Sequence, residues 1–107
     1  KIDLNIFFQF LSDESTWVRR KVATLLGWAQ IEGALPILKE LSRDAHSMVR
    51  RAALFSLATL YPDESEALFI EAMTDPDPEL RTWAKTTLEK ISIRLYKGKS
   101  APGTNRG

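Results

Sequence analysis

The side chains of a hydrolytic triad stand close together in the sequence around the single histidine of the chain. His46 is followed by Ser47 and comes two residues after Asp44, so a base, a hydroxyl and a carboxylate are all present. These three residues fall at the expected start of a helix, where Ser and Asp favour backbone capping. We therefore expect capping and no catalysis from this cluster, and we do not expect the chain to be an enzyme.

Composition excludes several other chemistries. The chain has no Cys, so neither a disulfide framework nor a thiolate metal site can form, and a cytoplasmic location is expected. No Gly-rich phosphate loop and no cluster of His or carboxylates at metal-ligand spacing is present, so we expect no cofactor and no metal. No apolar run approaches the roughly 20 residues that cross a bilayer, and no leader with a basic and then an apolar segment is visible, so we expect neither a membrane span nor a signal peptide.

Asp and Arg recur at a six-residue spacing, and this is the most regular charged pattern in the chain. The pairs are Asp13 and Arg19, Asp44 and Arg50, and Asp75 and Arg81. If the arginines stack in a row, they could bind anions. The alternative is a structural role, since a guanidinium is well suited to bind a carboxylate through two hydrogen bonds.

The elements that carry these residues repeat every 31 residues. Apolar residues such as Val18, Val22 and Leu26 recur at helical spacing, and one period later Val49, Ala53 and Leu57 do the same. Each repeat is predicted to hold two helices, and about six helices are expected in all. We call the first helix of each repeat a first-type helix and the second one a second-type helix. Second-type helices are predicted at 34–42 and at 65–73, the latter after a turn at 61–63. The last first-type helix is predicted at 79–96.

The predicted organisation is one repeat domain followed by a tail. The domain covers residues 1–96, with a half repeat at 1–12, repeats at 13–43 and 44–74, and a half repeat at 75–96. Residues 97–107 are expected to form a flexible basic tail, because Lys97, Lys99 and Arg106 lie there with Gly, Ser and Pro and without an acid. Residues 1–96 carry twelve bases against fourteen acids, although the whole chain has a net charge of +1.

The repeated pattern resembles HEAT repeats, particularly the short bacterial type also found in phycobilisome lyases. The residues that carry the resemblance are Asp13-Glu-Ser-Thr-Trp-Val-Arg-Arg and Asp75-Pro-Asp-Pro-Glu-Leu-Arg. The resemblance implies an all-α fold, a right-handed, armadillo-like α-solenoid of helical hairpins. It also implies a structural ladder of the Asp and Arg residues above, in which each Arg ties the turn of one repeat to the next helix. For this reason we favour the structural role of these residues over anion binding.

The resemblance further implies a protein-interaction scaffold. We expect the partner to bind the concave face lined by the second-type helices, where packing does not explain the polar residues Asn5, Gln9, Lys39, Glu40, Arg43, Glu66 and Glu71. This surface becomes acidic towards the C-terminal repeat, which favours a partner with basic patches. Trp17 and Trp28 replace polar or smaller residues of other repeats, so they are either interface anchors or ordinary packing residues.

Two further expectations concern partners. The first and last helices lack a neighbouring repeat, and the apolar Phe7, Phe8 and Phe10 crowd the first one. We therefore expect more chain in a parent protein, a partner that covers the ends, or self-association through them. Nucleic-acid binding is the main alternative function, since HEAT-like DNA alkylation repair glycosylases are related and bases occur at Arg20, Lys21, Arg43, Arg51 and Lys85. A non-catalytic relative of a bilin lyase is the other.

Overall fold

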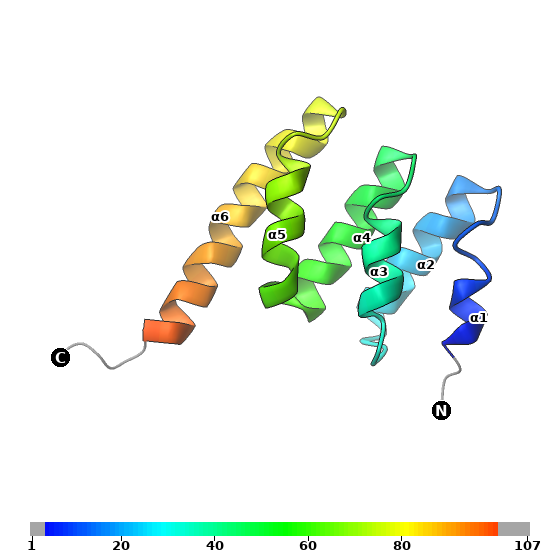
Figure 1. Cartoon of the computed structure of the whole chain (residues 1–107), viewed down its shortest axis with the longest axis horizontal. Coiled ribbons are helices and arrows are strands. Elements are labelled where there is room, and N and C mark those ends of the chain that lie inside the picture. The colour runs from blue at the N-terminus through cyan, green and yellow to red at the C-terminus, as the bar shows by residue number, and fades with distance from the viewer. Residues whose placement is uncertain (1–3, 101–107) are drawn as a thin grey trace. The chain divides into compact units, whose positions relative to one another are not determined.

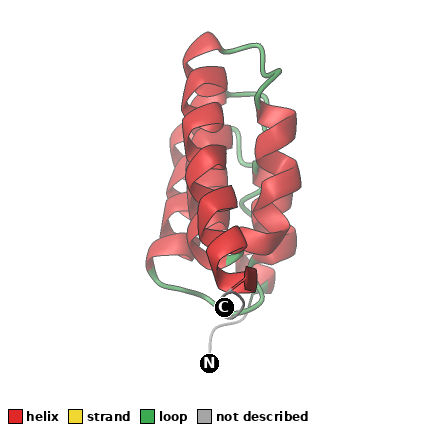
Figure 2. Cartoon of the chain, turned by 90° about the vertical axis from the view of Figure 1, so that its left-hand side faces the viewer, coloured by secondary structure: helices red, strands yellow, loops and turns green. Residues whose placement is uncertain are grey.

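The computed structural model describes the backbone of residues 4–100 and the side chains of residues 4–96. Within these residues the chain forms helices joined by loops and contains no strand (Figures 1 and 2). The all-α prediction is therefore confirmed. The helices are α1 (Asn5–Phe8), α2 (Thr16–Trp28), α3 (Leu35–Leu41), α4 (Ser47–Leu60), α5 (Pro62–Ala72) and α6 (Pro78–Ser100).

The three first-type helices begin at Thr16, Ser47 and Pro78, in the register of the sequence repeat. Each is capped by a side chain that accepts a hydrogen bond from a backbone N–H of the first turn. Ser15 accepts from Val18 at 3.3 Å, His46 Nδ1 from Met48 at 3.2 Å, and Asp77 from Glu79 at 3.0 Å. His46 thus serves as a cap in the triad-like cluster with Ser47 and Asp44.

The second-type helices differ from the prediction mainly at their starts. Helix α3 matches the predicted range to within one residue at each end, whereas α5 begins at Pro62 and includes the predicted turn at 61–63 from its second residue. The predicted start at Ser65 was wrong because Pro suits the first helical position, where its missing N–H costs nothing. Asp63 and Glu64 also lie in the first turn, where carboxylates are stabilised by the helix dipole.

Helix α1 is a single turn inside the predicted half repeat at 1–12. Helix α6 continues to Ser100, four residues beyond the predicted end at Tyr96, so the backbone of 97–100 is helical and the predicted tail begins too early. The remainder of that tail, with Arg106, and the side chains of Lys97 and Lys99 lie outside the described residues.

The chain divides into two compact units, Lys1–Tyr61 with α1 to α4 and Pro62–Gly107 with α5 and α6. The boundary falls between the two helices that were predicted to pair in repeat 44–74. The predicted repeat boundaries therefore stay a prediction, and each unit is described by itself.

In the first unit, α2 lies directly against α4. Ser56 of α4 donates a hydrogen bond of 2.7 Å from Oγ to the carbonyl of Ala23 in α2, and the bond is buried. A Cβ atom placed on Gly27 would lie 2.6 Å from Cβ and 3.0 Å from Cα of Ser56, so the absence of a side chain at Gly27 permits the close approach. The buried apolar residues of this unit are Phe7, Val22, Ala23, Leu26, Ile31, Ala34, Ile37, Leu38, Leu41, Val49, Ala53, Leu54 and Leu57.

In the second unit, α5 packs against α6. The rings of Phe69 and Trp83 lie 5.4 Å apart at an interplanar angle of 51°, which is within the favourable range for aromatic pairs. Ser92 of α6 donates a hydrogen bond of 3.4 Å to the carboxylate of Glu66 in α5. The buried apolar residues here are Leu68, Phe69, Ala72, Leu80, Ala84 and Ile91.

Candidate partner-binding surface

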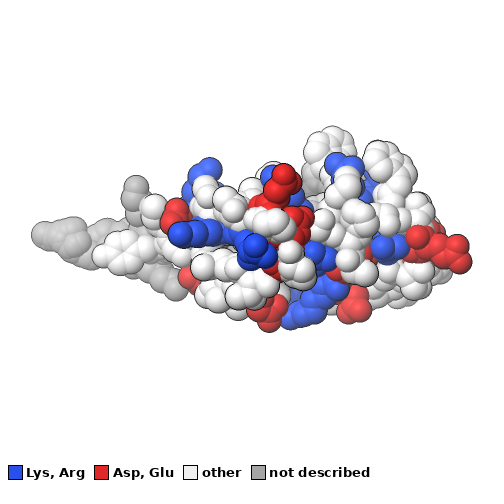
Figure 3. Space-filling view, turned by 90° about the horizontal axis from the view of Figure 1, so that it is seen from above, with Lys and Arg blue, Asp and Glu red and all other residues white. Residues whose placement is uncertain are grey.

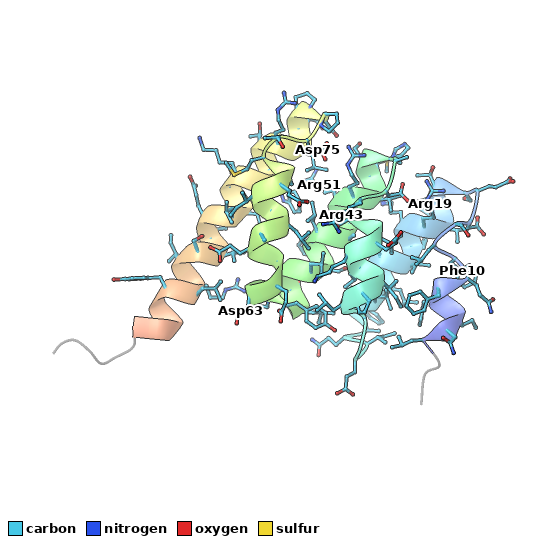
Figure 4. All side chains as sticks on the ribbon, viewed as in Figure 1. Phe10, Arg19, Arg43, Arg51, Asp63 and Asp75 are labelled. Atoms are coloured by element: carbon cyan, nitrogen blue, oxygen red, sulfur yellow. The ribbon has the colours of Figure 1, made fainter. Side chains whose placement is uncertain are left out.

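One rung of the predicted ladder lies within the first unit. Arg19, which is labelled in Figure 4, lies near the start of α2. It donates hydrogen bonds of 2.6 and 3.1 Å from Nε and Nη2 to the two carboxylate oxygens of Asp44 in the loop before α4. Its Nη1 also donates a bond of 2.6 Å to the carbonyl of Asp13. One guanidinium thus fastens the loop before α2 and the loop before α4 to α2.

The electrostatics of this pair favour the charged state of both groups. Burial raises the pKa of Asp44, but hydrogen bonds from Arg19 and from the backbone N–H of His46, together with the positive charge of Arg19, more than offset it, so the net pKa is lowered. The hydrogen bond to Asp44 likewise raises the pKa of Arg19. Because the Arg19 side chain is bound to these acceptors, we assign it a structural role.

The other two arginines of the pattern bind their own loops. Arg50 donates bonds of 3.0 Å to the carbonyls of Asp44 and Ala45, and Arg81 donates a bond of 2.7 Å to the carbonyl of Asp75. The Asp side chains repeat a second contact, because each accepts a bond from the N–H two residues later, at 2.8 Å for Asp13, 2.8 Å for Asp44 and 2.9 Å for Asp75. The three loops therefore share one construction, and further rungs of the ladder stay a prediction.

The polar residues predicted to bind a partner are distributed over both units. Asn5, Gln9, Lys39, Glu40 and Arg43 are exposed in the first unit, on α1, on α3 or directly after these helices. In the second unit Glu71 is exposed, whereas Glu66 is half-buried and accepts the bond from Ser92. Glu66 therefore has a contact inside its own unit, and the predicted concave face as a whole stays a prediction.

The two tryptophans singled out by the repeat comparison project into solvent. Trp28 is 82% exposed and Trp17 is 58% exposed, so neither is an ordinary packing residue. Two cations lie over the Trp17 ring, with Lys21 Nζ at 4.8 Å and Arg20 Cζ at 5.6 Å from its centroid. The exposed Trp17 ring thus lies next to two positive charges, those of Arg20 and Lys21, at the start of α2.

Sequence reasoning missed two exposed apolar residues on the neighbouring helix. Phe55 is 64% exposed and Met48 is 47% exposed, both on α4. The signal was available, because Met48 occupies the position of Trp17 one repeat later and Phe55 follows Met48 by two helical turns. The opening α1 also exposes Ile6 and Phe8, while Phe7 is buried.

The part of the chain that the structure describes shows no candidate metal site and no candidate membrane span. Among residues 4–96, no group of three or more His, Cys, Asp or Glu side chains could hold a metal ion. None of the described helices combines the length and the apolar character that a membrane crossing requires.

Comparison with known families agrees with the repeated loops and paired helices. The family model for HEAT repeats matches residues 4–58 and, overlapping these, residues 37–101. The chain therefore belongs to the HEAT-repeat family, whose helical pairs stack into α-solenoids and which generally provides non-catalytic scaffolds for protein interaction. No curated protein matches the chain.

Proposed function

We propose that this chain is a non-catalytic protein-interaction module that binds a protein partner through its exposed side chains. The observation that carries the proposal is the exposure of Trp28 and Trp17 on one helix of a repeat scaffold. Burial of a large exposed aromatic side chain lowers the free energy of a complex. Trp is also enriched among the residues that dominate binding at protein interfaces. Neighbouring polar residues would form the rim of such an interface.

The proposal is tested by proximity cross-linking and mass spectrometry in the source cells, comparing the unmodified chain with Trp17→Ala/Trp28→Ala. The matched control is Ile93→Ala/Tyr96→Ala, which removes two exposed apolar side chains from α6. Loss of a reproducible partner from the tryptophan variant alone supports the proposal. A set of neighbours that is the same for all three proteins contradicts it, provided that circular dichroism shows equal helicity.

The predicted polar surface receives its own test. Lys39→Glu with Glu40→Lys exchanges two exposed charges on α3 without changing the net charge, and Glu71→Lys reverses an exposed charge on α5. If the partner has basic patches, Glu71→Lys weakens its capture. Unchanged capture by both variants would show that these charges of α3 and α5 do not take part in binding. The exposed tryptophans of α2 would then be the remaining candidates for the interface.

Self-association is a second form of the same function. Ile6 and Phe8 of α1 are exposed, and burial against a second copy would remove them from water. Light scattering across a range of concentrations distinguishes the two forms. A mass that rises with concentration, and that falls back in Ile6→Ser/Phe8→Ser, supports self-association, whereas a constant monomer mass excludes it.

Nucleic-acid binding remains the alternative function, favoured by the two cations beside the exposed ring of Trp17. It predicts retention on duplex or single-stranded DNA at low salt and a steep loss of binding as salt rises. Lys21→Gln would make the loss of binding with rising salt less steep, because it removes one positive charge. No retention at 50 mM salt would exclude this alternative.

A further inference from the structure

The exposed apolar residues of the first unit gather on two helices. We use the name α2–α4 face for Trp17, Lys21 and Trp28 of α2 together with Met48 and Phe55 of α4, all of which are exposed. Lys21 follows Trp17 by four residues and Trp28 follows it by eleven, and both spacings return to one side of a helix. Met48 and Phe55 are seven residues apart and share one side of α4 in the same way.

Direct packing of α2 on α4 places these two helix sides next to each other. The buried bond from Ser56 to Ala23 and the close approach of Ser56 to Gly27 fix the two helices together. Met48 stands at the repeat position of Trp17, so equivalent positions of both helices face solvent. From above, basic side chains lie among projecting uncoloured side chains at this part of the molecule (Figure 3).

The charge of these two helices has one sign. Helix α2 contains Arg19, Arg20 and Lys21, helix α4 contains Arg50 and Arg51, and neither helix contains an Asp or Glu. Arg19 is neutralised by Asp44, but Lys21 and Arg20 lie over the exposed ring of Trp17. Helix α5 has the opposite character, with Asp63, Glu64, Glu66 and Glu71 and no base. The α2–α4 face therefore combines four exposed apolar side chains with one exposed cation, Lys21, and the half-buried Arg20 lies beside it over the same ring.

An acidic amphipathic helix would complement both the apolar residues and the positive charge of the α2–α4 face. We therefore infer that this face binds an acidic amphipathic helical segment of a partner protein. The inference rests on the proposed interaction function and specifies its surface and its ligand. Trp17 and Trp28 are eleven residues apart, about 16 Å along the axis at 1.5 Å per residue, which matches about three turns of a bound helix. Apolar side chains of that helix would cover Trp28 and Phe55, and its carboxylates would pair with Lys21 and Arg20.

The composition of the face favours a protein segment over a nucleic acid. Four of its five residues are apolar, and one of these, Met48, has no ring on which a base could stack, whereas the apolar side chains of a protein helix can cover all four. A polyanion requires a dense row of bases, whereas Arg19 already binds Asp44. A second copy of the chain is a weaker ligand than a separate partner, because within α5, the acidic helix, Ile70 is the large exposed apolar side chain, and it alone would not cover both tryptophans.

The test selects binders for the folded chain from a display library of random 16-residue peptides. The expected peptides are enriched in Asp and Glu and carry large apolar residues at spacings of three and four. Synthetic copies should bind Trp17→Ala/Trp28→Ala at least about tenfold more weakly, as expected for loss of interface anchors. Lys21→Glu should also weaken binding, whereas the matched Lys39→Glu on α3 and Ile93→Ala/Tyr96→Ala on α6 should not.

Each other outcome counts against the inference. The inference is overturned if no peptide is selected, if the selected peptides are not enriched in acidic residues, or if they bind the tryptophan variant equally well. Competition of the peptides by duplex DNA or by anionic phosphatidylserine vesicles, with tighter binding of that competitor, assigns the face to phosphate ligands instead. Light scattering that shows an oligomer broken by Lys21→Glu and by Glu71→Lys assigns the face to a second copy.

The proposed function and this inference can fail separately. If cross-linking finds a partner that is kept by Trp17→Ala/Trp28→Ala and by Lys21→Glu but lost on exchange of Lys39 and Glu40, the interaction function stands and the α2–α4 face is wrong. If no variant and no condition yields a partner, the proposed function fails as well.

Discussion

The guanidinium of Arg19 holds the carboxylate of Asp44, 25 residues further along the chain, through hydrogen bonds of 2.6 and 3.1 Å. Both side chains are largely buried, with 14% and 8% of their surfaces exposed. The pair connects the first turn of α2 to the loop that leads into α4, while a third bond from Arg19 reaches the carbonyl of Asp13. The spacing between neighbouring first-type helices is therefore fixed at their starts by one side chain.

Removal of the Arg19 side chain is expected to destabilise the fold. Arg19→Ala would leave the Asp44 carboxylate and the Asp13 carbonyl without these donors, and we expect a loss of about 1 to 3 kcal/mol in the free energy of unfolding. Arg19→Lys should restore only a part, because an ammonium cannot bind both carboxylate oxygens in the planar geometry of a guanidinium. Urea unfolding followed by circular dichroism measures both. Equal stability of Arg19→Ala and the unmodified chain would show that the pair contributes nothing.

The same pair makes stability depend on pH in the acid range. The pKa of Asp44 is lower in the folded state than its ordinary value of 3.8, so the unfolded chain takes up the proton first as pH falls. The stabilising contribution of Asp44 is therefore complete well above pH 3.8 and is lost as pH falls through that value and then through the lower folded-state pKa. We expect Asp44→Asn to be less stable at pH 7 and to lose less stability between pH 5 and pH 2. Parallel stability curves for the two proteins would contradict this assignment.

The fold was largely predictable from sequence because its signals are local and repeated. Helical spacing of apolar residues and the caps at Ser15 and Asp77 place the first-type helices in their register. The start of α5 was missed because Pro62 was interpreted as part of a turn, although Pro is equally well suited to the first position of a helix. A sequence rule cannot separate these two roles without the packing of the residues that follow.

The candidate surface was less predictable than the fold. Trp17 and Trp28 were identified because they break the repeat pattern, but their exposure could not be decided from sequence. Phe55 was missed because an aromatic residue on an otherwise apolar helix is most often a core residue. Whether it faces solvent depends on where α2 lies against α4, and that is fixed by Gly27 and Ser56, two small residues without a hydrophobic signal.

The contact between Gly27 and Ser56 gives a third prediction. A methyl group at Gly27 would overlap the Ser56 side chain, so Gly27→Ala should force α2 and α4 apart at a cost of about 1 to 3 kcal/mol, partly offset by the better helix propensity of Ala. Ser56→Gly removes the overlapping atoms, and the double variant should recover more stability than the sum of the single effects allows. A double-mutant cycle in urea measures this coupling. Additive effects would show that the two positions do not limit the approach of the helices.

The cap of α4 gives the last prediction, in which a substitution increases stability. His46 holds the position that Ser15 and Asp77 hold in the other repeats, and its Nδ1 accepts a bond of 3.2 Å from the backbone N–H of Met48. Ser is among the best residues at this position, and its hydroxyl can accept the same bond. We therefore expect His46→Ser to raise the free energy of unfolding by about 0.5 to 1 kcal/mol in urea unfolding followed by circular dichroism. Ser47→Ala, one residue later, is the matched control and should show no such gain. A His46→Ser variant that is less stable than the unmodified chain would mean that the imidazole makes a contribution beyond the cap.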